Sequence, residues 1–322
     1  MRRIRVFSPA SISNLGPGFD VLGLALAEPG DIVEVELSHE PGVQIVDVTG
    51  DGGLLSRSPD ENVAGVSASA ALKLIEQRAA GRDAPSGGPR GVRLWLQKAM
   101  PLGSGLGSSG ASSVAGAVAV DALFDASLSL HDLLHCALEG ERVASGAAHA
   151  DNVAPTLFGG IVLIRSYEPL DVVRLPVPGD LWVSVVHPHC SIRTAEARAL
   201  VKERRFTIDQ AVVNLGNLGG LISGFHSGNL SLVGRSIQDA LVEPARAHLI
   251  PGFHDVKKSA LEAGALGCSI AGSGPSMFAF CDSSTAADAV ALAMQRTFEH
   301  VARLESDRYV GRAGAPGART IE

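Results

Sequence analysis

The segment 101–111 constrains the fold of this chain more than any other feature of the sequence. It leads directly into a helix of small residues that we expect over 111–124, and its glycines leave backbone N–H groups uncovered. At the start of a helix, such donors and the positive end of the helix dipole favour an anion. The segment therefore predicts a loop that binds the phosphates of ATP, formed by Pro101, Leu102, Gly103, Ser104, Gly105, Leu106, Gly107, Ser108, Ser109, Gly110 and Ala111.

Other glycine-rich motifs fit this loop less well. A Walker A loop ends in Gly-Lys-Ser or Gly-Lys-Thr, and the loop contains no lysine. Gly105, Gly107 and Gly110 satisfy the G-x-G-x-x-G spacing, so a dinucleotide site is formally open. A Rossmann unit, however, places an acidic residue about twenty positions further on, after a second strand. Asp121 and Asp125 instead lie in or at the end of the expected helix. A flexible linker is the other alternative, but linkers do not open helices of such regular small-residue content.

A second polar group follows on a helix that we expect over 132–148. Helical spacing places Glu141, Ser145 and His149 on one side of this helix, with Asn152 near that side if the turn continues. The group offers one carboxylate for a metal and neutral polar atoms for a substrate. The alternative is a solvated helix face, because Glu and His are usually exposed.

Phosphoryl transfer mainly requires positioning and neutralisation of charge, which a phosphate loop and magnesium supply. Glu141 can hold Mg²⁺, and the hydroxyls of Ser108 and Ser109 can donate to phosphate or bind the metal. The sequence leaves open which of the two serines touches the metal. ATP and Mg²⁺ are thus the expected cofactors.

The first loop of the chain and two later arginines carry groups that suit an amino-acid substrate. Asp20 and Asn14 could bind an ammonium group and a hydroxyl. Arg193 and Arg246 could each hold a carboxylate through two parallel hydrogen bonds. For the arginines, the alternative is a salt bridge at the protein surface.

Composition excludes several other classes of protein. The formal net charge is −7 without a basic cluster, so we expect no nucleic-acid partner. The four cysteines are far apart and form no CxxC pair, which favours a reducing cytoplasm over a disulfide framework or a zinc site. The histidines of 187–190 and 131–135 lack further ligands, so no zinc is assigned there either. Glycines and a proline interrupt the apolar region near the start of the chain that a secretory signal would need, so we expect no such signal. No apolar run is long enough for a membrane span.

The element pattern favours an α+β fold in two domains, 1–170 and 171–322. Helices are expected over 63–80, 111–124, 132–148, 194–203, 208–223, 230–241 and 254–264, with a loop over 81–91. Strands are expected over 4–6, 32–37, 92–97, 158–165 and 181–186, and as a pair around 272–274. No regular strand–helix repeat is present, which argues against a doubly wound sheet. From residue 306 onward we expect a short strand or a loosely held end.

Taken together, these residues resemble the GHMP kinases, and within them the homoserine kinase family. The resemblance extends from Ser8 to about Phe280. Its motifs occur in the family's order: 9–20 (PASISNLGPGFD), the loop 101–111, 149–155 (HADNVAP), 243–246 (EPAR) with 249–252 (LIPG), and 270–276 (IAGSGPS). The loop alone identifies only the superfamily, whereas the first motif resembles homoserine kinases rather than their relatives.

The resemblance implies a GHMP kinase fold, with an N-terminal domain like domain 2 of ribosomal protein S5 and a ferredoxin-like C-terminal domain. It implies ATP-dependent phosphorylation of the L-homoserine hydroxyl in threonine biosynthesis, often by a homodimer. It also implies residue roles: Asn62 at adenine, Ser109 and Glu141 at Mg²⁺, Gly272 in the turn that closes near the phosphates, and the homoserine pocket of Asn14, Asp20, His149, Asn152, Arg193 and Arg246.

Two details of the resemblance bear on mechanism. Several superfamily members have an aspartate suited to act as a base where this chain has Asn152, as homoserine kinases do. We therefore expect direct attack of the substrate hydroxyl on the γ-phosphate without a strong enzymic base. Gly110 replaces the alanine of many relatives and should loosen the helix start by up to about 1 kcal/mol. The alternatives are another GHMP kinase acting on mevalonate or a similar alcohol, and a regulator that keeps the fold without catalysis.

Overall fold

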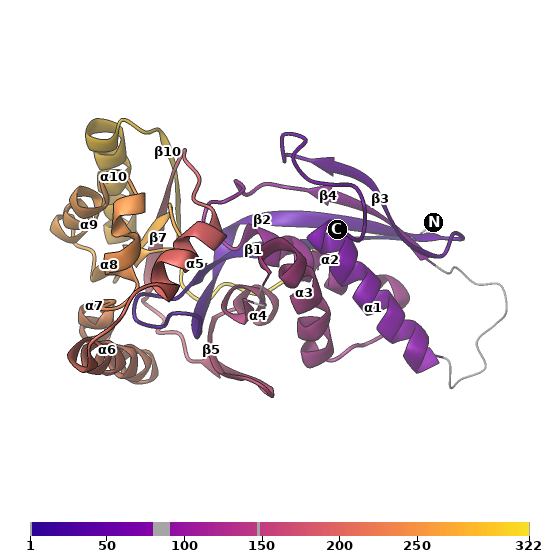
Figure 1. Cartoon of the computed structure of the whole chain (residues 1–322), viewed down its shortest axis with the longest axis horizontal. Helices are drawn as coiled ribbons and strands as arrows, with labels where there is room; N and C mark the ends of the chain where they lie inside the picture. The colour runs from indigo at the N-terminus through magenta and orange to yellow at the C-terminus, as the bar shows by residue number, and fades with distance from the viewer. Residues whose placement is uncertain (1, 80–90, 147–148, 322) are drawn as a thin grey trace.

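The computed structural model describes residues 2–79, 91–146 and 149–321. The loop expected over 81–91 lies outside the described residues except for Gly91, which begins a strand. Figure 1 shows two lobes side by side, each built of one sheet with helices packed on it. Within the described part of the chain, no helix has the length and apolar character needed to cross a membrane.

The first sheet has seven strands among the described residues and runs mainly antiparallel. Its main path is β11-β1-β2-β4-β3, and β5 extends it from β2 and pairs with β6. The exception is the parallel pair of β3 and β4. The strands are β1 (Arg3–Ser13), β2 (Leu22–Ser38), β3 (Gly42–Thr49), β4 (Gly91–Gln97), β5 (Ile161–Tyr167), β6 (Leu170–Leu175) and β11 (Arg319–Ile321).

Four helices cover one face of this sheet (Figure 1). The sheet and these helices together form the N-terminal lobe. They are α1 (Val63–Ala79), α2 (Ser108–Phe124), α3 (Leu130–Ser145) and α4 (Ala150–Phe158). The small residues of α2 allow close packing against α1, because a Cβ on Gly116 would lie 2.4 Å from the Ala64 carbonyl oxygen. This helix is buried along nearly its whole length, which fixes the phosphate loop that precedes it.

The C-terminal lobe is built on a four-stranded antiparallel sheet of order β10-β7-β9-β8. Its strands are β7 (Trp182–Pro188), β8 (Gly267–Ile270), β9 (Met277–Cys281) and β10 (Ser306–Arg312). Its helices are α5 (Thr194–Lys202), α6 (Ile208–Ser227), α7 (Leu230–Ser236), α8 (Glu243–Arg246), α9 (Phe253–Glu262) and α10 (Ser284–Thr297), with short turns η1 (Ala247–Leu249) and η2 (Phe298–Ala302). A shared apolar core that includes Leu24, Val183 and Phe280 joins the lobes.

The structure corrects several expected elements. The helix over 132–148 ends at Ser145, because Gly146 adopts a left-handed conformation and caps it. The helix over 230–241 ends at Ser236, and Phe158 still belongs to α4 rather than to a strand. The elements that no expectation covered are β3, α4, β6, α8, α10 and β11, together with the short turns η1 and η2.

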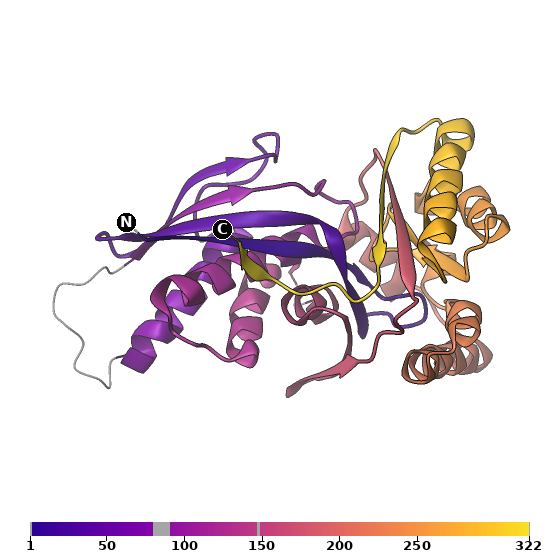
Figure 2. The same cartoon turned by 180° about the vertical axis from the view of Figure 1, so that it is seen from behind.

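The domain division 1–170 and 171–322 stays a prediction. Residues of β6 lie beyond 170 and still pair with β5 in the first sheet. The chain then enters the second sheet at Trp182, and after β10 it returns to the first sheet as β11. Figure 2 shows this last segment running back between the lobes.

Candidate active site

A cavity of about 650 Å³ opens between the lobes, a size typical of small-molecule sites. Segments from both lobes line it: the loop after β1, the loop before α1, the residue after β4, the phosphate loop, α3, α4, α5, α8 and the turn after β8. Most of the site residues predicted from the sequence line this cavity: Asn14, Asp20, Asn62, Leu102, Gly103, Ser104, Gly105, Gly107, Ser108, Ser109, Glu141, His149, Asn152, Arg193, Arg246 and Gly272.

The phosphate loop presents backbone donors to the cavity. Gly103, Gly105 and Gly107 all have positive φ angles, which side chains other than glycine rarely adopt. Gly107 is the N-cap of α2 and supplies no side-chain hydrogen bond, so the first N–H groups of the helix stay available to a ligand. A Cβ on Gly107 would lie 2.2 Å from the Ser11 hydroxyl oxygen, so glycine is also required by packing. These features fit a polyphosphate.

Four residues of the predicted loop do not line the cavity. Leu106 and Ala111 are fully buried in the core that joins the lobes. Gly110 packs against α4, since a Cβ there would lie 3.5 Å from a Val153 methyl group. Pro101 is partly buried at the entrance of the loop. These residues shape the loop rather than face the cavity.

A buried lysine lies beneath the loop, at a position that sequence reasoning missed. Lys98 follows β4 and its side chain is only 1% exposed. Its ammonium group forms an ion pair with Asp31 and donates to the hydroxyl oxygens of Ser108, at 2.7 Å, and Ser112, at 2.8 Å. Burial lowers the pKa of Lys98, and the charge of Asp31 opposes that effect. The alternation of buried residues along β4 was the available signal, because 92, 94, 96 and 98 share one face.

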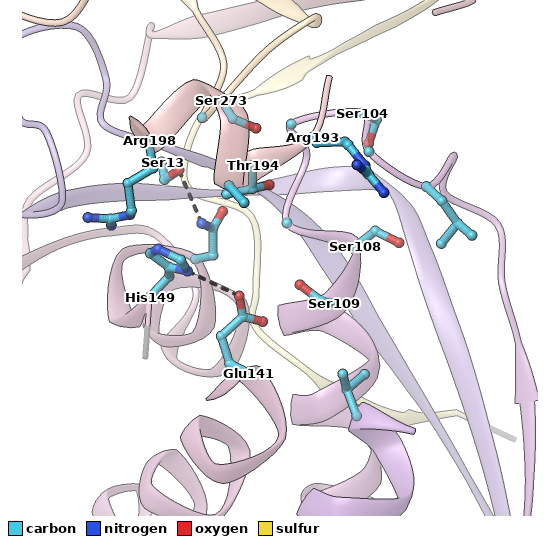
Figure 3. Close-up of a pocket in the computed structure, with 18 of the residues that line it drawn as sticks. Ser13, Ser104, Ser108, Ser109, Glu141, His149, Arg193, Thr194, Arg198 and Ser273 are labelled. Atoms are coloured by element: carbon cyan, nitrogen blue, oxygen red, sulfur yellow. Dashed lines mark hydrogen bonds and ion pairs between the residues drawn. The ribbon is translucent and has the colours of Figure 1, made fainter. Parts of the chain in front are cut away.

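Glu141 lies on the wall of the cavity and is almost fully buried. Its Oε1 lies 3.4 Å from His149 Nδ1, so these residues meet although a helix break separates them. Figure 3 shows the Ser109 hydroxyl on the Glu141 side and the Ser108 hydroxyl on the other side. One carboxylate and one hydroxyl beside a phosphate loop suit Mg²⁺, which usually takes few protein ligands and completes its shell with phosphate and water. Ser145 was predicted on the same face; its side chain lies outside the described part of the chain.

Asp151 is a second acid that sequence reasoning missed. It is 2% exposed, and its Oδ1 has no hydrogen-bond partner among the described residues. Burial, followed by the charge of Asp20, raises the pKa of Asp151 to about 7. Burial alone would lower the pKa of His149, but the hydrogen bond with Glu141 and the charge of Asp151 outweigh it, so that pKa is raised. At this end of the cavity the charged form of Asp151 is therefore disfavoured.

The arginine that faces this end is Arg198, not Arg193. Both oxygens of Asp20 accept hydrogen bonds from Arg198, at 2.9 and 2.8 Å. Arg193 is instead 84% exposed and lies 3.5 Å from Glu196. In Figure 3 the two arginines point away from each other, Arg193 toward Ser104 and Arg198 toward the side of His149. Arg193 also lines the cavity, and its role in the substrate pocket stays a prediction. Sequence reasoning did not single out Arg198, which lies inside α5, whereas Arg193 precedes that helix.

Arg246 is buried and anchored to the turn after β8. It donates to the carbonyl oxygens of Ala197 and Gly272, both at 3.1 Å. Asn14 also donates to Gly272, at 2.8 Å, so two residues predicted for the substrate hold this turn. The Phe19 ring lies 5.1 Å from the Arg246 guanidinium and 5.6 Å from that of Arg198. The two cations therefore share one wall of the cavity.

The two remaining predicted residues are held by their amide groups. Asn152 accepts a hydrogen bond from Ser11 and donates one to Ser13, both at 3.1 Å. Asn62 accepts from the backbone of Ala64 and so caps the start of α1. Each amide retains further hydrogen-bonding capacity for a ligand.

Comparisons with known proteins agree with this architecture. Residues 66–160 match the family model of the GHMP kinases N terminal domain, and residues 214–300 match that of GHMP kinases C terminal. The chain is 45% identical to the homoserine kinase of Chlorobium phaeobacteroides (strain BS1), with 100% of both chains covered. The homoserine kinase of Arabidopsis thaliana is 40% identical, over 99% of this chain and 84% of that one. The chain belongs to the homoserine kinases of the GHMP kinase family.

A solved structure supports the same relationship. The homoserine kinase from Cytophaga hutchinsonii ATCC 33406 has a TM-score of 0.92 and 47% identity to this chain, covering 100% of this chain and 98% of that one. The predicted α+β GHMP kinase fold is thereby confirmed, as is an ATP-dependent kinase that phosphorylates a hydroxyl group. The roles of individual residues stay predictions.

Proposed function

We propose that this protein transfers the γ-phosphate of ATP to the hydroxyl of L-homoserine, giving O-phospho-L-homoserine for threonine biosynthesis. The observation that supports L-homoserine as the substrate is the mixed charge at the end of the cavity away from the phosphate loop. Arg198 and Arg246 lie there with Asp20 and Asp151. A zwitterionic amino acid can satisfy both signs, since its carboxylate suits the arginines and its ammonium the acids.

Mevalonate fits this arrangement less well. It has a carboxylate and a hydroxyl but no ammonium group, so it would leave the buried Asp151 without a cation. A noncatalytic regulator is disfavoured by the intact phosphate loop and by Glu141. These are the two alternatives that the acceptor assay below separates.

The residues proposed for Mg²⁺ are Ser109 and Glu141. When bound, Mg²⁺ would neutralise charge on the transferred phosphate. The N–H groups at the start of α2 would orient the phosphates, and Asn62 would contact adenine. His149 would keep the Glu141 carboxylate in position through its Nδ1.

The acceptor hydroxyl is proposed to attack without a strong base. Asn152 does not ionise, and its hydrogen bonds to Ser11 and Ser13 fix its amide beside the loop. Asn14, Asp20, Arg246 and Gly272 would complete the pocket, with Arg198 taking the role expected of Arg193. The nearest rival base is Asp151, whose pKa of about 7 suits proton transfer. If kcat fell with protonation of one group and Asp151→Asn abolished that dependence, the base-free mechanism would be wrong.

A homodimer in the cytoplasm is part of the proposal. Helix α6 exposes a row of apolar residues, of which Ile208 is 80%, Val212 62% and Leu215 66% exposed. They recur on one side of the helix, where a second copy could cover them. Sedimentation of the wild type and of Val212→Glu tests this: a monomeric wild type contradicts the dimer. The cysteines, all free, suit a reducing compartment.

The deciding experiment measures ADP release with ATP and Mg²⁺ in the presence of L-homoserine, mevalonate, L-serine or no acceptor. Turnover confined to L-homoserine supports the proposal. Turnover with mevalonate alone would keep the kinase and overturn the substrate. Absence of turnover while ATP still binds would favour a regulator.

A further inference from the structure

Lys98 has all its donors committed within the protein. Its Nζ has acceptors in Asp31, in the backbone oxygen of Ser108 at 3.0 Å, and in the hydroxyls of Ser108 and Ser112. An ammonium group has only three N–H bonds. Lys98 therefore does not reach a phosphate itself, although it lines the cavity. Whatever it does for the ligand acts through its neighbours.

Two of these neighbours, Ser108 and Ser112, line the cavity. A hydroxyl has one proton to donate and two lone pairs to accept with. Lys98 can only donate, so it occupies one lone pair of Ser108 Oγ at 2.7 Å. The Ser108 proton must therefore point away from the ammonium group. Ser112 differs, because its own proton is donated to Asp31 at 2.7 Å.

The two serines at the start of α2 thus stand in different electrostatic settings. A divalent cation on Ser108 Oγ would stand beside the Lys98 ammonium, and like charges repel. Ser109 has the Glu141 carboxylate on its side instead (Figure 3). Asp31 keeps the buried lysine paired and is itself held by the Ala99 N–H, at 3.1 Å.

We propose that Lys98, held by Asp31, is a positioning residue that makes Ser108 a hydrogen-bond donor to ATP phosphate and leaves Ser109 as the hydroxyl for Mg²⁺. The inference rests on ATP use in the proposed function. It goes beyond that function because it assigns different roles, phosphate binding and Mg²⁺ binding, to two adjacent serines. It concerns nucleotide binding alone and does not depend on which acceptor is phosphorylated.

The test measures binding of AMP-PNP by calorimetry without metal and without acceptor, and binding of adenosine by competition. The variants are Ser108→Ala, the charge-neutral pair Lys98→Met with Asp31→Asn, and all three changes together. Lys258→Met at an exposed position is the matched control. We expect the first two variants to weaken AMP-PNP binding by about 10-fold. Adenosine, which has no phosphate, should change by less than about twofold because the adenine contacts remain.

The combined variant decides whether Lys98 acts through Ser108. If it does, adding Ser108→Ala to the Lys98/Asp31 variant causes no further loss. Additive losses, or equal weakening of adenosine, would overturn the proposal and make Lys98 a purely structural residue. Thermal melts check that each variant folds.

A second comparison needs no change at Lys98. Ser109→Ala should leave metal-free AMP-PNP binding unchanged and reduce the gain in affinity on adding Mg²⁺. Ser108→Ala should weaken metal-free AMP-PNP binding and leave the gain in affinity on adding Mg²⁺ unchanged. The opposite pattern would overturn the assignment of the serines. A protein that failed to phosphorylate L-homoserine would still give a clear result in both assays, so failure of the proposed function and failure of this inference are distinguishable.

Discussion

The two ends of the cavity are built in different ways. The phosphate end is one continuous segment whose donors are backbone N–H groups, fixed by the buried helix α2 that follows. The acceptor end combines side chains from segments far apart in the chain, such as Asp20 with Arg198 and Asn14 with Gly272. A binding site formed by the backbone of one local segment can be recognised in the sequence. A site assembled from side chains that are far apart in the chain cannot be recognised in this way.

The difference also concerns charge. At the phosphate end the buried charges, Lys98 and Asp31, pair with each other. At the acceptor end Asp151 stays buried without a hydrogen bond to its Oδ1 among the described residues, and its pKa is raised to about 7 by burial and then by Asp20. The buried lysine of the phosphate end thus has its counter-charge within the protein, whereas Asp151 at the acceptor end has a carboxylate oxygen without a hydrogen bond among the described residues. Substitutions at the two ends should separate accordingly.

The largest effect is expected at the phosphate end, from Glu141→Gln. Loss of the carboxylate should lower kcat by about 100-fold and raise the Mg²⁺ concentration needed for half-maximal rate, with little change in the KM for L-homoserine. Initial rates over a Mg²⁺ series measure this. Glu139→Gln, on the exposed side of the same helix, is the matched control. An unchanged Mg²⁺ requirement would remove Glu141 from the metal site.

An intermediate effect is expected at the acceptor end, from Arg198→Met. The change keeps the apolar stem and should raise the KM for L-homoserine by about 30-fold, the usual cost of losing charge-assisted hydrogen bonds. The KM for ATP should change little. Arg193→Met serves as the comparison, because its side chain is 84% exposed. Equal effects of the two substitutions on the L-homoserine KM would contradict the preference for Arg198.

The smallest effect is the pH dependence of stability without ligand. Because the folded-state pKa of Asp151 is raised to about 7, the folded protein retains a proton that the unfolded chain loses near its ordinary value. Stability therefore falls as pH rises toward 7, and the raised pKa of His149 acts in the same direction. Urea unfolding should give a free energy lower by about 1 kcal/mol at pH 8 than at pH 6 from Asp151 alone.

Asp151→Asn should remove that part of the pH dependence, and Asp288→Asn, at an exposed position, should not. Saturating L-homoserine should also reduce it, since an ammonium near Asp151 favours the charged carboxylate. A pH slope identical in the wild type and in Asp151→Asn would show that burial does not hold the proton there.

What the sequence could predict follows the same division. The loop 101–111 was recognisable because glycine and serine in front of a small-residue helix have few other uses. Lys98 was predictable in principle, since strand alternation places it with buried residues, but its partner Asp31 lies on another strand. Arg198 was obscured because nothing local distinguishes it from Arg193. The break at Gly146 was missed because helical spacing alone continued smoothly past it.

The return of β11 to the first sheet has a consequence for how the chain is made. Residues 319–321 pair with 5–7 of β1, and Arg319 packs over the Phe7 ring at 4.6 Å. The edge of the first sheet is thus finished by residues that the ribosome adds long after β1. Until then the β1 edge stays open to pairing with other chains. A chain cut just before Arg319 would retain every residue that lines the cavity and still carry a sheet edge prone to aggregation.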